Sequence, residues 1–142
     1  IPLRLVGSEM FIRDRHRGVA KSLLRCYYRM ADVMLVTPFK DGMNLVAKEY
    51  VACHDDGSGA LVLSEFAGAA DELSQAYLCN PFDIESVKAA LLNALKALGD
   101  APSAMSQRML TMHQQVTEHD VQLWSQSFLG CLRDAEAQGD GA

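Results

Sequence analysis

Three short apolar runs, each followed by turn residues and a helical pattern, constrain this chain more than any other feature. They are Val33–Val36, the run ALVL at residues 60–63, and AYLCNP, which Pro81 ends. Uninterrupted runs of this length are typical of strands buried on both faces. Their alternation with helices indicates β–α–β units with right-handed crossovers. We therefore predict an α/β fold with a parallel sheet and flanking helices.

Segments with helical periodicity surround these runs. We predict helices from Val19 to about Met30, across LVAKEYVAC after Asn44 as N-cap, within SEFAGAADEL, and from Asp83 as N-cap to Gly99. The last of these has an apolar face of Ile84, Val87, Leu91, Leu95 and Leu98.

Two amphipathic helices are predicted to close the fold. Their apolar stripes, which we expect to pack in the core, are Met105, Met109, Met112 and Val116, and then Val121, Trp124, Phe128 and Leu132. We expect one domain over residues 19–134. Residues 1–18 have mixed charge without a sustained period, and the small polar residues of 135–142 predict a disordered tail.

Composition excludes several classes of function. The chain has 142 residues and a net charge of -5, with no basic stripe, so we exclude a nucleic-acid partner. No apolar run approaches the roughly 20 residues that span a bilayer, so we expect no membrane partner. The chain begins with Ile1 rather than methionine, which suggests truncation or processing.

Cysteines and histidines show no metal-ligand spacing, so we expect no metal. We expect buried, reduced thiols and surface histidines in a cytoplasmic protein. The residues concerned are Cys26, Cys53, Cys79 and Cys131, and His16, His54, His113 and His119.

The loop after the first predicted strand, TPFKDGMNLVAKEY, is the first candidate site. In open parallel sheets, ligands bind beyond the carboxyl ends of the strands. Gly42 allows a ligand to approach the backbone, and Lys40 adds a nearby positive charge. The N–H groups of Asn44, Leu45 and Val46 open the next helix, where a phosphate would be stabilised.

Two acidic residues, Asp41 and Glu49, frame this segment. An ionised carboxylate accepts hydrogen bonds and can hold two sugar hydroxyls. One could bind a hexose and the other a ribose, with a pyrophosphate between them at the helix start. The alternative makes Asp41 a turn residue and Glu49 a solvated charge, and spacing alone leaves both readings open.

Other nucleotide-binding and catalytic motifs are either absent or stand at the wrong position relative to the predicted strands. Gly57-Ser58-Gly59 precedes a strand, whereas a dinucleotide fingerprint follows one. Neither a Walker motif nor a G-x-S-x-G elbow is present. A phosphorelay receiver would need an aspartate at a strand end, where this chain has Thr37.

Three segments closely resemble trehalose-6-phosphate synthases: ADVMLVTPFKDGMNLVAKEYVAC, GALVLSEFAGAADEL and AYLCNPFD. The resemblance is continuous from about Tyr27 to Asp83 and looser to about Leu132. DGMNLVAKEYV is a long and specific motif. Glucosylglycerol-phosphate synthases share much of it and are the nearest alternative; a non-catalytic nucleotide-sugar-binding remnant is another.

The resemblance implies the C-terminal, donor-binding half of a GT-B glycosyltransferase, a hexosyltransferase with two Rossmann-like domains. Such enzymes transfer glucose from UDP-glucose to glucose 6-phosphate with retention and without a metal or other cofactor. The implied donor-glucose residues are Asp41, Gly42, Met43 and Asn44. Leu45 and Val46 would offer N–H groups to the diphosphate, and Glu49 would bind the ribose.

The resemblance also implies what this stretch lacks. The acceptor-binding residues and the basic pair at the diphosphate lie upstream of the matched region, so no catalytic residue can be assigned here. We expect an N-terminal Rossmann-like domain as the missing partner, and an inactive fragment without it. Residues 1–18 do not resemble what precedes this region in the family, and we interpret them as foreign sequence. A homo-oligomer is left open.

Overall fold

The structure, a computed structural model, describes residues 18–119 and 121–139. Its elements follow in chain order: α1 (Lys21–Met30), β1 (Val33–Val36), α2 (Leu45–Ala52), β2 (Ala60–Ser64), α3 (Ala69–Glu72), β3 (Tyr77–Cys79), α4 (Ile84–Asp100), α5 (Pro102–Glu118) and α6 (Val121–Gly139). Residues 1–17 of the predicted atypical segment lie outside the described residues.

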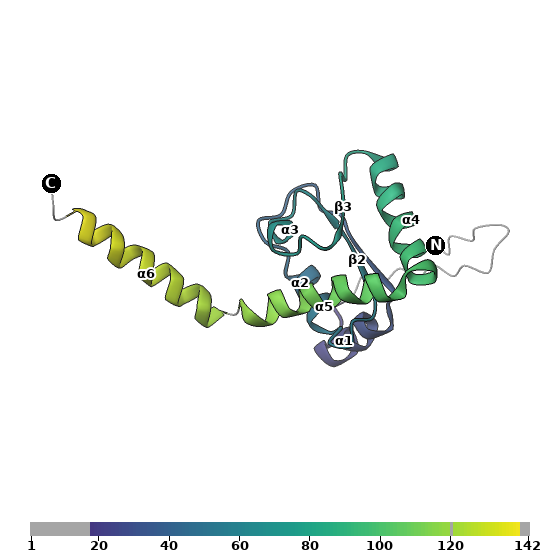
Figure 1. The fold of residues 1–142 in the computed structure, drawn as a ribbon, viewed down its shortest axis with the longest axis horizontal. Helices are drawn as coiled ribbons and strands as arrows, with labels where there is room; N and C mark the ends of the chain where they lie inside the picture. Colours follow the sequence, from purple (N-terminus) through teal and green to yellow (C-terminus); the bar gives the residue numbers. More distant parts are fainter. Residues whose placement is uncertain (1–17, 120, 140–142) are drawn as a thin grey trace.

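The three strands form a parallel sheet in the order β1-β2-β3, with helices on both of its faces (Figure 1). Val33 pairs with Ala60, and Leu63 of the central strand pairs with Leu78. The predicted α/β class and parallel Rossmann-like sheet are therefore confirmed.

The central strand β2 supplies both halves of the core. Leu61 and Leu63 pack with α2, α3 and α5 on one face, whereas Ala60 and Val62 pack with α4 on the other. All four are at most 2% exposed. Burial on both faces explains why this strand is an uninterrupted apolar run rather than an alternating one.

Helix α4 packs on the sheet through part of the predicted apolar face, because Val87, Leu91 and Leu98 are partly buried against the core. Ala90 and Ala94 are its buried residues, while Ile84 and Leu95 are 68% and 49% exposed. Alanines let the helix axis approach the sheet closely, so the larger residues pack beside the contact or point outward. The predicted N-cap is confirmed, because Asp83 Oδ1 accepts from the Glu85 N–H group at 2.9 Å.

The predicted methionine stripe packs in the core. Met105 joins the cluster against α4, and Met109 and Met112 join the opposite cluster, so α5 contacts both halves of the core.

Two residues of the stripe predicted for the last helix, Phe128 and Leu132, do not pack in the core. Phe128 and Leu132 are 51% and 47% exposed because α6 extends away from the sheet (Figure 1). This helix continues to Gly139, so residues 135–139 of the predicted disordered tail are helical. No helix among the described residues is long and apolar enough to cross a membrane.

Candidate functional site

The loop after β1 is held against the loop after β2. The Asp41 N–H group donates to the Phe66 carbonyl at 3.2 Å, and the Asp41 carbonyl accepts from Gly68 at 2.9 Å. The Met43 carbonyl accepts from the Ala69 N–H group at 2.7 Å. The predicted site loop is therefore fixed to the start of α3 through its backbone.

The Asp41 carboxylate is part of this loop's own hydrogen bonding. It accepts from the Met43 N–H group through Oδ1 and from Asn44 Nδ2 through Oδ2, both at 3.0 Å. The Met43 bond, followed by the Asn44 bond, holds the pKa of Asp41 below its usual value. Asp41 is therefore an ionised turn residue, and its remaining lone pairs can still accept from a ligand.

Asn44 begins α2 as predicted. Its side-chain oxygen accepts from the Ala47 N–H group at 2.9 Å, and its φ of 72° lies in the left-handed region that asparagine tolerates. The next residues, Leu45 and Val46, occupy the first turn, where an α-helix leaves N–H groups without intrahelical acceptors. Their side chains are 61% and 42% exposed, so the helix start is open to solvent.

A pocket of about 230 Å³ lies at this loop. It brings together Asp41 and Gly42 from the loop after β1 with residues after β2. Its full lining is Lys40, Asp41, Gly42, Glu65, Phe66, Ala67, Gly68 and Asp71. The residues contributed after β2 were absent from the sequence prediction, although GALVLSEFAGAADEL carried part of the family resemblance.

Glu49 lies on α2, away from the loop pocket. It lines a larger pocket of about 340 Å³ between α1 and α2. The Tyr28 hydroxyl donates to Glu49 Oε2 at 3.1 Å. The pocket is lined by Lys21, Leu24, Arg25, Tyr28, Glu49, Ala52 and Cys53. Asp41 and Glu49 therefore line two different pockets, although both belong to the continuous segment 41–49.

Sequence reasoning missed the contribution of α1 to this pocket. The spacing of Leu24 and Tyr28 predicts one face of a helix, but core packing would produce the same spacing. Tyr28 is 6% exposed and packs with the core, so core packing explains part of this spacing. Its hydroxyl nevertheless reaches the candidate site.

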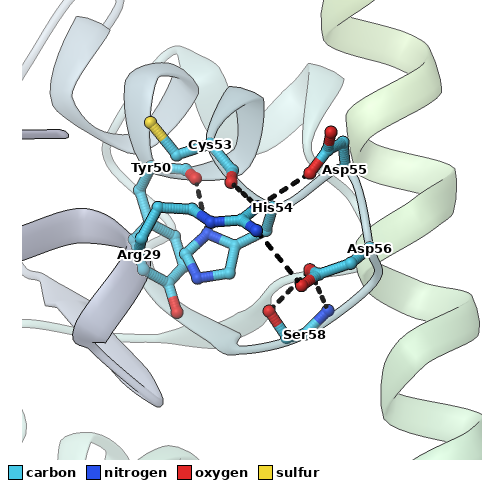
Figure 2. Close-up of polar contacts among 7 residues, drawn as sticks. All are labelled: Arg29, Tyr50, Cys53, His54, Asp55, Asp56 and Ser58. Carbon is cyan, nitrogen blue, oxygen red and sulfur yellow. Dashed lines mark hydrogen bonds and ion pairs between the residues drawn. The ribbon is translucent and has the colours of Figure 1, made fainter. Parts of the chain in front are cut away.

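Arg29 anchors α1 to the end of α2, as Figure 2 shows. Its Nη1 donates to the Cys53 carbonyl at 2.6 Å and to Asp55 Oδ1 at 2.7 Å, and Nη2 lies 3.4 Å from Asp56 Oδ2. Asp56 is itself oriented by Ser58, whose N–H and hydroxyl donate to Oδ1 at 3.0 and 2.6 Å. This cluster fixes one wall of the α1–α2 pocket relative to the other.

His54 is buried beside this cluster, contrary to the predicted surface position. It is 1% exposed, and its Nδ1 lies 2.8 Å from the Tyr50 carbonyl oxygen (Figure 2). A carbonyl oxygen only accepts, so Nδ1 carries the hydrogen of this bond. The bond allows the ring to be buried against Tyr50, at 4.3 Å between ring centroids.

The four cysteines are free, but only Cys79 is buried; Cys53 is partly buried, and Cys26 and Cys131 are exposed. The prediction of buried thiols is therefore wrong for the exposed pair, which lie on α1 and α6. Among the described residues, no three His, Cys, Asp or Glu side chains are grouped to hold a metal ion.

Comparison with known proteins finds trehalose-6-phosphate synthases among the relatives of this chain. The chain is 53% identical over 123 residues to a trehalose-6-phosphate synthase of Mycobacterium leprae (strain TN), covering 87% of this chain and 24% of the relative. A solved UDP-forming α,α-trehalose-phosphate synthase of Burkholderia xenovorans, in complex with glucose-6-phosphate, matches with TM-score 0.74 and 42% identity. That match covers 83% of this chain and 26% of the solved one.

A second solved structure, trehalose-6-phosphate synthase from E. coli bound with UDP-2-fluoro glucose, matches with TM-score 0.73 and 43% identity. It covers 82% of this chain and 25% of that structure. The chain thus spans about a quarter of the length of these relatives.

A family model agrees with these relatives over most of the chain. The model of glycosyltransferase family 20 matches residues 11–134 and begins inside the segment 1–18 that we interpreted as foreign. The chain therefore belongs to glycosyltransferase family 20.

Proposed function

We propose that this chain is the donor-binding part of an α,α-trehalose-6-phosphate synthase, which transfers glucose from UDP-glucose to glucose 6-phosphate with retention. The observation that carries the proposal is the folded DGMNLVAKE segment. Its loop is held by backbone hydrogen bonds to the α3 start, its helix opens to solvent, and Glu49 lies at a second pocket along the same helix.

The distance along α2 suits a nucleotide sugar. Glu49 follows Asn44 by five residues, or about 7–8 Å along a helix rising 1.5 Å per residue. A diphosphate at the helix start would then have the sugar on the loop side and the ribose toward Glu49. We assign the donor glucose to Asp41, Gly42, Met43 and Asn44, the diphosphate to the Leu45 and Val46 N–H groups, and the ribose to Glu49.

The pocket between α1 and α2 provides room for the nucleoside base beyond the ribose. Leu24 and Ala52 offer apolar contact, whereas Lys21 and Arg25 add positive charge at the rim. The relatives described above include one bound with UDP-2-fluoro glucose, which supports a uridine nucleotide as occupant.

The chemical contribution of this part is stabilisation of the leaving group. Negative charge grows on the diphosphate as the bond to glucose breaks, and oriented N–H groups at a helix start stabilise such charge without rearranging. No metal or other cofactor enters the proposal. Acceptor binding belongs to the N-terminal Rossmann-like domain of a longer protein, so we expect the present chain to bind the donor without turning it over.

Two further expectations belong to this proposal. The relatives are trehalose-6-phosphate synthases, so we do not retain the glucosylglycerol-phosphate alternative. The free cysteines support the predicted cytoplasmic location, because oxidising compartments favour disulfides.

Titration calorimetry of the chain with UDP and UDP-glucose tests the proposal. We expect both to bind, and Glu49→Ala to weaken UDP about tenfold or more, because a buried ribose hydroxyl would lose a charged acceptor. Glu85→Ala is the matched control, since Glu85 is an exposed acid on α4, paired with Lys88. Absence of UDP binding, or equal affinities for the wild type and Glu49→Ala, would contradict the assignment.

A further inference from the structure

Tyr28 connects the core to the carboxylate of Glu49. Its side chain is 6% exposed, and its ring meets the Tyr50 ring edge-on, with centroids 6.3 Å apart and planes at 87°. Tyr50 is fully buried and donates its own hydroxyl to the Ala31 carbonyl at 2.9 Å. The position of the Tyr28 hydroxyl is therefore set by core packing rather than by solvent.

Glu49, in contrast, is an exposed side chain on the surface of α2. A free glutamate samples many rotamers, and ordering it for a ligand costs conformational entropy. Its Oε2 accepts from the Tyr28 hydroxyl at 3.1 Å, the one side-chain hydrogen bond to this carboxylate among the described residues. Arg29, which follows Tyr28 on α1, is directed to Cys53, Asp55 and Asp56 and not to Glu49.

The chemistry of the pair leaves capacity for a ligand. A carboxylate has about four acceptor positions, and the tyrosine occupies one of them. Burial, and then the hydrogen bond to Glu49, raise the pKa of Tyr28 to about 12. At neutral pH the hydroxyl is thus protonated and can only donate toward this carboxylate.

We propose that Tyr28 is a positioning residue of the nucleotide site: its hydroxyl holds Oε2 of Glu49 so that the remaining carboxylate lone pairs receive the two ribose hydroxyls. This inference rests on the proposed ribose role of Glu49 and adds the residue that orients it. Tyr28 acts through Glu49 and makes no contact with the reacting atoms.

The test compares two ligands in each variant by calorimetry: UDP and 2′,3′-dideoxy-UDP, which lacks both ribose hydroxyls. Tyr28→Phe removes the hydroxyl and keeps the ring on Tyr50. We expect it to weaken UDP about three- to tenfold, as for the net loss of one ordinary hydrogen bond, because Glu49 keeps its charge and loses only its orientation, and to leave dideoxy-UDP unchanged. Tyr77→Phe, on β3, is the matched control and should change neither affinity.

The ratio of the two affinities within one variant separates positioning from general damage to the fold. The inference is overturned if Tyr28→Phe weakens UDP and dideoxy-UDP by the same factor. It is also overturned if Tyr28→Phe weakens neither ligand. Adding Tyr28→Phe to Glu49→Gln should weaken UDP little further, because the two side chains act as one unit. Fully additive losses would also overturn it.

The same data show which proposal fails. If the wild type does not distinguish UDP from dideoxy-UDP, the ribose role of Glu49 is wrong and the inference falls with it. If the wild type distinguishes them and Glu49→Gln does not, while Tyr28→Phe behaves like the wild type, the proposed function stands and only the role of Tyr28 is wrong.

Discussion

The carbonyl oxygen of Asp41 accepts a hydrogen bond from the Gly68 N–H group at 2.9 Å. The bond joins the loop after β1 to the residue that precedes α3. Asp41 also pairs with Ala67 as an isolated parallel bridge, so the two loops continue the sheet for one further step beyond its strands. The geometry of the candidate sugar pocket depends on this close backbone approach.

Gly68→Ala should therefore damage the site. A Cβ atom at Gly68 would overlap the carbonyl group of Gly42, and backbone cannot move aside as a flexible side chain can. We expect a loss of about 1–3 kcal/mol in the free energy of unfolding, as for other overpacked sites. We also expect weaker binding of UDP-glucose. Urea denaturation and calorimetry measure the two effects.

Gly42→Ala is the matched control for stability, because a Cβ at Gly42 meets nothing within 4 Å. Its unfolding free energy should stay equal or rise by up to about 1 kcal/mol, since alanine restricts the unfolded chain. Similar losses in both variants would contradict the close-approach explanation for Gly68.

Asn44 combines a helix cap with a left-handed backbone, and two substitutions separate the contributions. Asn44→Ala loses the bond to Ala47 and strains the φ of 72°, so we expect a loss of about 1–2 kcal/mol in unfolding free energy. Asn44→Gly keeps the backbone conformation accessible and should cost only a few tenths of a kcal/mol. Urea denaturation of both variants checks this order; the reverse order would show that neither the cap nor the backbone conformation limits stability here.

Stability should fall in alkaline solution through two tyrosines. Burial raises the pKa of Tyr50 to about 12, and burial and the Glu49 bond raise that of Tyr28 to about 12, against about 10 in the unfolded chain. The unfolded state therefore releases these protons first. The two tyrosines contribute fully to the free energy of unfolding below pH 10. This contribution is lost as the pH rises through 10 toward 12.

Urea denaturation of the wild type and Tyr28→Phe at about pH 8 and pH 11 measures this dependence. The variant should lose less stability between the two conditions, because one of the two shifted groups is gone. An equal loss would mean that Tyr28 titrates as an exposed tyrosine does.

Arg29→Ala should loosen α1 from the end of α2. The variant loses the bonds to the Cys53 carbonyl and Asp55, so we expect a lower melting temperature and weaker UDP binding in the α1–α2 pocket. Arg29→Lys should recover only part of the loss, because an ammonium group cannot reproduce the planar fork of a guanidinium. Thermal unfolding at low and high salt measures the change.

The exposed pair Lys88–Glu85 supplies the control for Arg29. Both side chains are more than half exposed, and such pairs contribute little, so Lys88→Ala should leave the melting temperature nearly unchanged. A drop as large as that of Arg29→Ala would mean that general surface charge, rather than the anchoring of α1, explains the loss.

The features that the sequence predicts correctly are local ones. The run Val33–Val36 is a strand with the predicted bounds, and Asn44 and Asp83 cap their helices through N–H groups three and two residues away. Such interactions are encoded within a few neighbouring residues, so composition and spacing reveal them. The hydrogen bonds of the Asp41 carboxylate are equally local, since it accepts from residues 43 and 44, although spacing alone left open whether Asp41 is a turn residue or binds a sugar.

Contacts between distant segments could not be predicted in this way. Tyr28 and Glu49 are 21 positions apart and meet only because α1 and α2 pack together. The small residues Ala90 and Ala94, rather than Leu95, face the sheet because the approach of α4 depends on the surface that it packs against. The sequence by itself thus determined the strands, the caps and the position of the loop motif along the chain. Tertiary packing determined which side chains surround Glu49, because hydrophobic periodicity identifies a buried face without identifying its partner.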